Sequence, residues 1–160
     1  MAENKNIINQ RDRLASPCMG ICTTTYGDPV CKGCKRFVHE IADWSAYSEG
    51  QRTAVSERLQ NQARNAVLSY FRIVDEKALW SYVEQENRVR YYPDWCPEHT
   101  VFQLLFYRIF SGFEALRECG VEPLPEYRSQ SLEELVQHVD SLYNRLGQDY
   151  YNDHVVSQQG

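Results

Sequence analysis

Apolar residues recur at helical spacing through most of the chain that follows residue 48. Ser48 and Gln51 form a capping-box pattern, which is typical of a helix start. The segment that follows carries one apolar stripe, so we predict a long helix that ends near Phe71. The stripe consists of Val55, Leu59, Ala63, Ala66, Val67 and Tyr70.

The second half of the chain shows three further helical patterns. Asp75 can cap a helix over DEKALWSYVEQENRV, with Leu79, Trp80 and Val83 facing inward. Pro97 suits the first turn of a strongly apolar helix, VFQLLFYRIFSGFEAL, that Gly120 ends. A second capping box begins a last helix that we expect to end at Gly147, with Leu135, Val139, Leu142 and Leu146 as its stripe.

These patterns predict a mainly α fold: a small four-cysteine knuckle, then a helical body of about four to five helices. No segment shows a clear strand pattern, and VEPLPEYRSQ is interpreted as a Pro-rich loop. We divide the chain into a flexible tail (1–15), a metal-binding module with the long helix (16–72), an acidic helical body (73–148) and a second flexible tail (149–160).

Four cysteines lie close together near the start of the chain, as a C-x3-C pair and a C-x2-C pair. Cys18, Cys22, Cys31 and Cys34 can converge into a tetrahedral set of thiolates, which suits zinc or an iron–sulfur centre. Gly33 can adopt a left-handed turn that aims two sulfurs at one point. The spacing therefore predicts a metal site and leaves zinc and an iron–sulfur cluster open.

Charge is distributed unevenly along the chain, whose net charge is −5. Residues 1–72 carry ten Lys or Arg against seven Asp or Glu, and residues 73–160 carry seven against fifteen. Lys32, Lys35 and Arg36 surround the cysteines and can offset the negative charge of a metal–thiolate centre. The acidic chain and the scattered arginines of the long helix argue against binding to duplex DNA.

The chain has no apolar run long enough to cross a membrane, and residues 1–15 lack the apolar core of a signal peptide. We therefore expect a cytoplasmic protein without membrane contact. Cysteines stay reduced in the cytoplasm, so metal ligation is favoured over disulfides.

The motif SPC-x-GIC, C-x-GC-x-R, E-x-x-x-W and S-x-x-x-R resembles the small bacterial domain-of-unknown-function 1289 family, whose members are often labelled predicted iron–sulfur proteins. The matching residues are Ser16, Pro17, Cys18, Gly20, Ile21, Cys22, Cys31, Gly33, Cys34, Arg36, Glu40, Trp44, Ser48 and Arg52. The resemblance covers residues 16 to about 62. It implies a bacterial cytosolic protein with the four cysteines as ligands, and it implies no activity.

Cys96 and His99 form a second candidate site, with C-x2-H spacing at a helix start. The helix dipole could acidify the thiol, or the two side chains could share a metal. The alternative is a buried, inert Cys96 and a surface His99. Cys119 is interpreted as a packed residue.

Basic and aromatic side chains around the cysteines form a candidate partner-binding patch: Lys32, Lys35, Arg36, Phe37 and Trp44. Such a patch suits single-stranded RNA or a protein, although aromatics in so small a module also serve as its core. No nucleophile, phosphate loop or paired-carboxylate motif accompanies it. We therefore expect a non-enzymatic module with structural zinc that contacts a protein or RNA partner. The alternative is an iron–sulfur protein with a redox, sensing or RNA-modification role.

Overall fold

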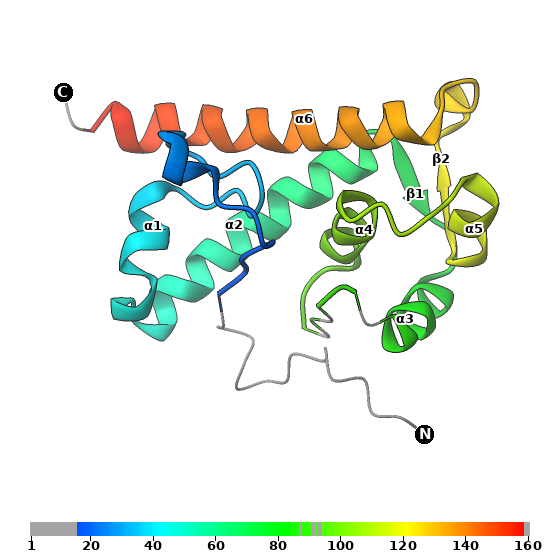
Figure 1. The fold of residues 1–160 in the computed structure, drawn as a ribbon, viewed down its shortest axis with the longest axis horizontal. Helices are drawn as coiled ribbons and strands as arrows, with labels where there is room; N and C mark the ends of the chain where they lie inside the picture. Colours follow the sequence, from blue (N-terminus) through cyan, green and yellow to red (C-terminus); the bar gives the residue numbers. More distant parts are fainter. Residues whose placement is uncertain (1–15, 87, 91, 93, 159–160) are drawn as a thin grey trace.

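The computed structural model describes residues 16–86, 88–90, 92 and 94–158, and in these ranges the chain is mainly helical, as predicted (Figure 1). The helices are α1 (Val38–Asp43), α2 (Glu49–Leu68), α3 (Glu76–Gln85), α4 (Pro97–Phe106), α5 (Phe113–Glu118) and α6 (Leu132–Tyr151). Single helical turns lie at Thr23–Tyr26 (η1), Trp44–Ala46 (η2), Pro125–Tyr127 (η3) and Asn152–Val156 (η4). The predicted tail 1–15 lies outside the described residues.

Helix α2 begins and runs where the sequence pattern predicts it. The Ser48 hydroxyl accepts a hydrogen bond from the Gln51 amide, and the Gln51 side chain accepts one from the Ser48 amide. This capping box satisfies two backbone donors that a helix start leaves unpaired. The predicted stripe is buried except for Tyr70, which is half-buried. The helix crosses diagonally beneath α6 in Figure 1.

Helix α6 also starts at its predicted capping box, where Ser131 and Glu134 exchange hydrogen bonds. The prediction that it ends at Gly147 is wrong, because the helix continues to Tyr151 and then into the η4 turn. Gly147 is a packing residue: a Cβ atom there would lie 3.3 Å from Cγ1 of Val30. The expected loose tail is therefore helical as far as Val156, and residues 159–160 lie outside the description.

The apolar segment that begins at Pro97 forms two helices, not the single helix that its composition predicts. Helix α4 ends at Phe106 and α5 begins at Phe113. Arg108 has a left-handed backbone with φ 55. The Arg108 amide donates to the Leu105 carbonyl, and the Ile109 amide donates to the Leu104 carbonyl. This arrangement is a Schellman ending, in which glycine is the usual left-handed residue. Because this position is occupied by Arg108 and not by glycine, the sequence gives no sign that the helix ends here.

Two short strands were also missed. Strand β1 (Phe71–Ile73) pairs antiparallel with β2 (Val121–Pro123), so that Arg72 lies opposite Glu122. Each strand has only three residues, too few for an alternating pattern to be evident. Gly120 ends α5 as predicted, with φ 80, and a Cβ atom there would lie 2.2 Å from the Asp75 carbonyl oxygen. Asp75 in turn caps α3 through the Ala78 amide.

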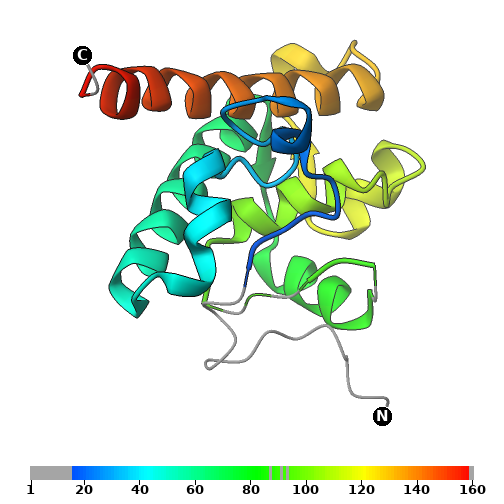
Figure 2. The same ribbon diagram turned by 60° about the vertical axis from the view of Figure 1, so that its left-hand side comes forward.

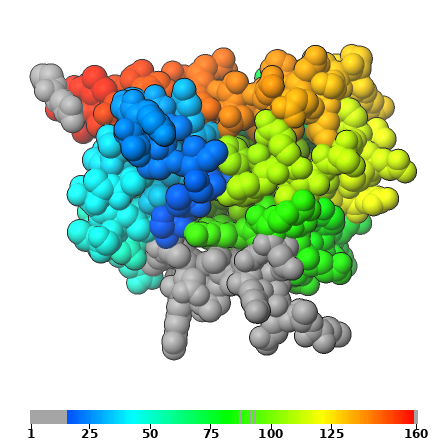
Figure 3. Space-filling view, viewed as in Figure 1, coloured from blue at the N-terminus to red at the C-terminus, as the bar shows by residue number. Residues whose placement is uncertain are grey.

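The cysteine-bearing loop of residues 16–36 lies against α4, α6 and α1, and Figure 2 shows it beneath α6. On the molecular surface it occupies the blue area between the cyan α1 segment and the green body (Figure 3). One hydrophobic cluster contains Met19, Cys31 and Cys34 of this loop together with side chains of α2, α4 and α6. The loop and the helical body therefore share one core.

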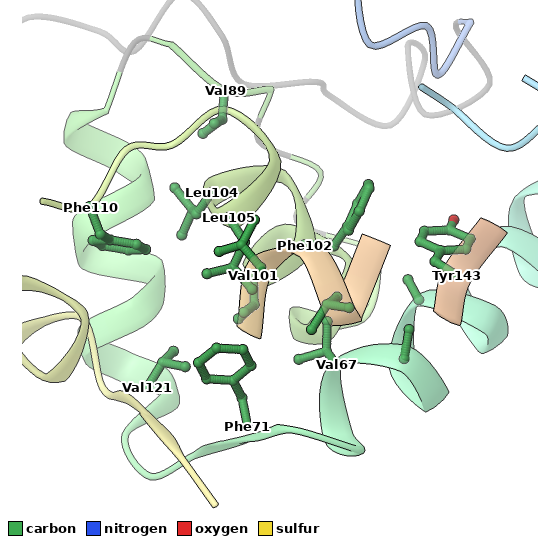
Figure 4. Close-up of a cluster of buried hydrophobic side chains, with 14 of the residues drawn as sticks. Val67, Phe71, Val89, Val101, Phe102, Leu104, Leu105, Phe110, Val121 and Tyr143 are labelled. Carbon is green, nitrogen blue, oxygen red and sulfur yellow. The ribbon is translucent and has the colours of Figure 1, made fainter. Parts of the chain in front are cut away.

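The centre of that core is formed by α2, α4 and α6 (Figure 4). Phe71 and Val121 of the strands lie at one end of the cluster, and Tyr143 of α6 lies at the other. The Tyr143 ring is buried, and its hydroxyl donates to the Leu59 carbonyl of α2 at 2.9 Å. Burial of this many apolar side chains is the main stabilising contribution to the fold.

Candidate metal-binding site

The second cysteine pair lies on a tight turn between Val30 and Phe37. The Cys31 amide donates to the Arg36 carbonyl, and the Lys35 amide donates to the Cys31 carbonyl, both at 2.9 Å. Lys35 has a left-handed backbone with φ 68, which is rare for a residue with a side chain. This turn places the two thiols near enough to influence each other's pKa.

The first cysteine loop packs directly on that turn. Cys31 Sγ lies 3.3 Å from the Ile21 carbonyl oxygen. A Cβ atom on Gly33 would lie 2.6 Å from the same oxygen, so only glycine fits there. Ile21 is flanked by Gly20 and Cys22, and the two cysteine segments are therefore in contact through backbone.

The first pair, Cys18 and Cys22, is half-buried and has hydrogen-bonding partners within its own loop. Cys18 Sγ accepts a hydrogen bond from the Gly20 amide at 3.4 Å. Cys22 Sγ lies 3.0 Å from the Thr24 hydroxyl, within hydrogen-bonding distance. The Thr23 hydroxyl accepts from the Lys32 amide at 2.8 Å, which joins this loop to the second turn.

The titration of Cys31 and Cys34 is coupled. The hydrogen bond from Cys34 lowers the pKa of Cys31 to about 4, and the same contact together with burial raises the pKa of Cys34. The pair therefore readily loses one proton and retains the second. A thiolate is the form of cysteine that binds metals, so this pair is chemically prepared for a cation.

Arg36 is the cation closest to the sulfurs. Its Nε donates to Cys34 Sγ at 3.3 Å, and its Nη2 donates to the Ser16 hydroxyl at 2.9 Å. Its guanidinium also lies 4.8 Å from the Trp44 ring centre. The side chain is buried, so its positive charge acts on the sulfur at low dielectric, as expected for a residue that offsets thiolate charge.

The other motif residues hold α1 and the start of α2 against the cysteine turn. Both carboxylate oxygens of Glu40 accept hydrogen bonds from Arg58, at 2.6 and 2.7 Å. One of them also accepts from the Phe37 amide at 2.8 Å. Arg52 Nε donates to the Trp44 carbonyl at 3.0 Å. The Glu40 carboxylate is thus fully used in structural contacts, and the arginines of α2 each have a different partner: Trp44 for Arg52, Glu40 for Arg58 and Glu98 for Arg64.

The four cysteines fit a metal in their chemistry, since all are free thiols on two contacting loops. Over residues 16–86, 88–90, 92 and 94–158, no group of three or more Cys, His, Asp or Glu side chains lies close enough together to hold a metal ion. The pair Cys31 and Cys34 is brought together, and Cys18 and Cys22 have other partners. The four-cysteine site stays a prediction.

The candidate partner patch does not form an exposed surface. Lys35, Arg36, Phe37 and Trp44 are buried, and Lys32 is the exposed member of the set. The Lys35 amine donates to Asp140 of α6 at 2.7 Å and to the Lys32 carbonyl. These side chains bind the loop to the body instead, because a short loop has little other core.

Cys96 and His99 are both buried at the start of α4. The Cys96 thiol donates to the Gln60 carbonyl at 3.6 Å, and burial raises its pKa, opposite to the predicted acidification. Burial also lowers the pKa of His99 to about 3, and its ring lies 4.5 Å from that of Trp95. His99 is therefore not the surface residue that the alternative prediction assumed. Cys119 is packed, as predicted, and burial raises its pKa to about 12.

Sequence reasoning missed the body residues that hold the cysteine loops. Tyr107, at the end of α4, donates its hydroxyl to the Met19 carbonyl at 2.7 Å. Arg90 donates to the Ser16 carbonyl at 2.5 Å, and Asp140 accepts from Lys35. All three lie more than 50 residues from their partners along the chain, so no local pattern could indicate the contacts.

The geometry defines a small, mainly helical protein in which a cysteine-bearing loop is built into the helical core. Residues 16–63 match the model of a family described as "Protein of unknown function (DUF1289)", which confirms the resemblance inferred from the motif. The match covers the cysteine loop, α1 and most of α2, and it ends before the body. No curated protein and no solved structure matches the chain. No described helix is long and apolar enough to span a bilayer.

Proposed function

We propose that the chain is a non-enzymatic metal-binding module of the bacterial cytoplasm, in which Cys18, Cys22, Cys31 and Cys34 hold a structural zinc ion. The observation that carries the proposal is the direct packing of the two cysteine segments, with the Ile21 carbonyl 3.3 Å from Cys31 Sγ. The buried Cys31–Cys34 pair loses a proton readily. Zinc prefers four thiolates of this kind at structural sites.

A structural role fits the surroundings of the cysteines better than a catalytic one. Glu40, the nearest buried carboxylate of the motif, is occupied by Arg58 and the Phe37 amide. His39 and Asp43 are exposed on α1. Four protein ligands leave no position on the metal for a substrate, so a metal held in this way would stabilise the loop.

Because most of the candidate patch is buried, the exposed side chains of Ile21, Tyr26 and Lys32 are the better candidates for contact with a protein or RNA partner. Ile21 is 54% exposed and Tyr26 is 89% exposed. The Lys32 side chain, 66% exposed, lies on the same pair of loops. Exposed aromatic and apolar side chains beside a lysine suit either partner.

An iron–sulfur cluster on the same four cysteines is the second candidate, with a redox, sensing or RNA-modification role. It is favoured by the fixed N–H donors at two sulfurs, Arg36 Nε at Cys34 and the Gly20 amide at Cys18. Hydrogen bonds to sulfur are one means by which proteins set the reduction potential of a cluster.

Metal analysis of the full chain purified without oxygen tests both candidates. We expect colourless protein with zinc in equal amount to protein, and we expect Cys31→Ala and Cys34→Ala to abolish binding. Cys119→Ala, a change at a buried cysteine outside the motif, is the matched control and should keep the metal. Iron with visible absorbance would establish the second candidate, and protein without either metal would contradict both.

Hydrogen exchange then tests the structural role of the metal. Chelation should remove protection from amides of residues 16–47, because metal binding and local folding are coupled. Amides of α2, α4 and α6 should retain protection, since their core is mainly apolar side chains. Unchanged protection in the cysteine loop after chelation would show that the metal has no structural role.

A further inference from the structure

A hollow of about 410 Å³ opens beside Cys18, on the side of the loop that faces the body. Its walls are residues 18–20 of the cysteine loop, residues 88–90 of the segment between α3 and α4, and Tyr107 at the end of α4. In Figure 3 the blue start of the loop borders the green body in this region. The hollow is thus formed jointly by the family segment and the body.

The lining of this hollow is positively charged in a chain whose net charge is −5. Where the structure describes the chain, the lining contains Arg88 and Arg90 and no carboxylate. Arg90 is held in place by its hydrogen bond to the Ser16 carbonyl at 2.5 Å. The Tyr92 side chain is a second neutral partner of Arg90. Among the described residues no carboxylate pairs with Arg90, so its positive charge is not neutralised by a side chain there.

Arg88 is the more exposed of the two and has an internal partner. Its Nε and Nη2 donate to the carboxylate of Glu86, both at 2.7 Å, and its side chain is 63% exposed. This ion pair uses the Nε and Nη2 edge of the guanidinium and leaves the N–H groups of Nη1 to bind a ligand. The contact with Glu86 orients Arg88 and also competes with any anion for it.

We propose that the hollow binds the phosphate group of a small phosphorylated ligand. A guanidinium fork matches the oxygens of a phosphate group, and two such forks around one hollow suit a doubly charged group. The Tyr107 hydroxyl and the Gly20 backbone lie on the remaining walls. The charges that would bind the ligand belong to the arginines, so this inference goes beyond the proposed metal-binding function and is tested separately from it, although Cys18 also lines the hollow.

The test is a titration of the full chain with glycerol phosphate at constant ionic strength, followed by the amide resonances of Gly20 and Val89. We expect saturable shifts with a dissociation constant of roughly 1 mM, a value typical of weak small-ion sites. Arg88→Gln should weaken binding about tenfold, because it removes a charge-assisted hydrogen bond. Glu86→Gln should strengthen binding, since it releases Arg88 from its internal partner.

Arg72→Gln is the matched control, because Arg72 is a half-exposed arginine that also pairs with a glutamate, Glu122 of β2. It should leave the affinity unchanged. Three results would each overturn the inference: shifts that do not saturate, equal affinity in Arg88→Gln, or equal binding of acetate or chloride. Binding of a single-stranded oligonucleotide without binding of glycerol phosphate would also overturn it.

Discussion

The cysteine-bearing segment, residues 16–47, and the helical body are stabilised by different kinds of contact. In the segment, buried charges carry the structure: Arg36 at Cys34, Glu40 with Arg58, and Lys35 with Asp140. In the body, α2, α4 and α6 pack apolar side chains. A buried polar network with every group paired makes a segment rigid, and loss of one partner leaves a buried charge unpaired. A rigid segment can hold metal-binding side chains in fixed positions.

The largest expected effect comes from removing one partner of a buried ion pair, which tests whether buried charges stabilise the cysteine-bearing segment. Glu40→Ala should lower the free energy of unfolding by about 3–5 kcal/mol, because it leaves the Arg58 guanidinium buried without a carboxylate. Arg58 is only 12% exposed and lies 4.0 Å from the Phe37 ring centre. Urea unfolding measures the loss.

An exposed ion pair provides the control for that experiment. Arg108 and Glu133 are 48% and 57% exposed, so Glu133→Ala should cost less than about 1 kcal/mol. If Glu40→Ala costs no more than Glu133→Ala, buried charge is not what stabilises the segment.

A cavity in the body tests whether the two regions unfold together. Leu104→Ala, at a fully buried position of α4, should cost about 2–5 kcal/mol. Because Met19 and Cys34 belong to the same core cluster, amides of the cysteine segment should lose as much protection from hydrogen exchange as those of α6. Protection that falls in α6 alone would mean that the segment folds independently.

His99 gives the body a pH dependence of its own, in addition to that of Cys31 in the segment. Burial lowers its pKa from 6.5 to about 3, so below pH 6.5 the unfolded chain binds a proton that the folded chain rejects. Stability should therefore fall as the pH decreases from about 6.5 to about 3, by up to about 1.4 kcal/mol per pH unit. His99→Phe should reduce the slope of the free energy of unfolding against pH between pH 6 and pH 4, measured by urea unfolding, and the slope that Cys31 contributes should remain. An equal slope in the variant would assign the acid sensitivity to other groups.

Local signals were sufficient to predict α2 and the starts of α3, α4 and α6, because a cap and its apolar stripe lie in one stretch of sequence. Contacts between distant residues account for the errors. Gly147 resembles a helix end but makes room for Val30, and β1 is a strand only because β2 pairs with it. The left-handed Arg108 ends α4 without the glycine that would have indicated it.

In the candidate site, too, the features with a local sequence signal could be predicted, and those that depend on distant contacts could not. The cysteine spacing and the motif identify the family segment. The prediction of a left-handed turn at Gly33 is wrong, because Lys35 is the left-handed residue there and Gly33 is needed for its close approach to the Ile21 carbonyl. The patch of Lys35, Arg36 and Phe37 was assigned to the surface because sequence does not show that the body covers it. A carboxylate more than 100 residues away, Asp140, is what allows the lysine to be buried.

The smallest expected effect tests whether the body fixes the first cysteine loop. Tyr107→Phe removes the hydroxyl, with its hydrogen bond to the Met19 carbonyl and its weaker contact with the Met19 sulfur, and it should cost about 0.5–1.5 kcal/mol. Tyr127→Phe, in the η3 turn beside β2, is the control for loss of a tyrosine hydroxyl. In Tyr107→Phe, amides of residues 18–22 should exchange roughly 2–10-fold faster, while those of α2 change little. Equal exchange of residues 18–22 in both variants would show that the Tyr107 hydroxyl does not hold the loop, and that the contacts of Arg90 with Ser16 and of Lys35 with Asp140 are sufficient to position it.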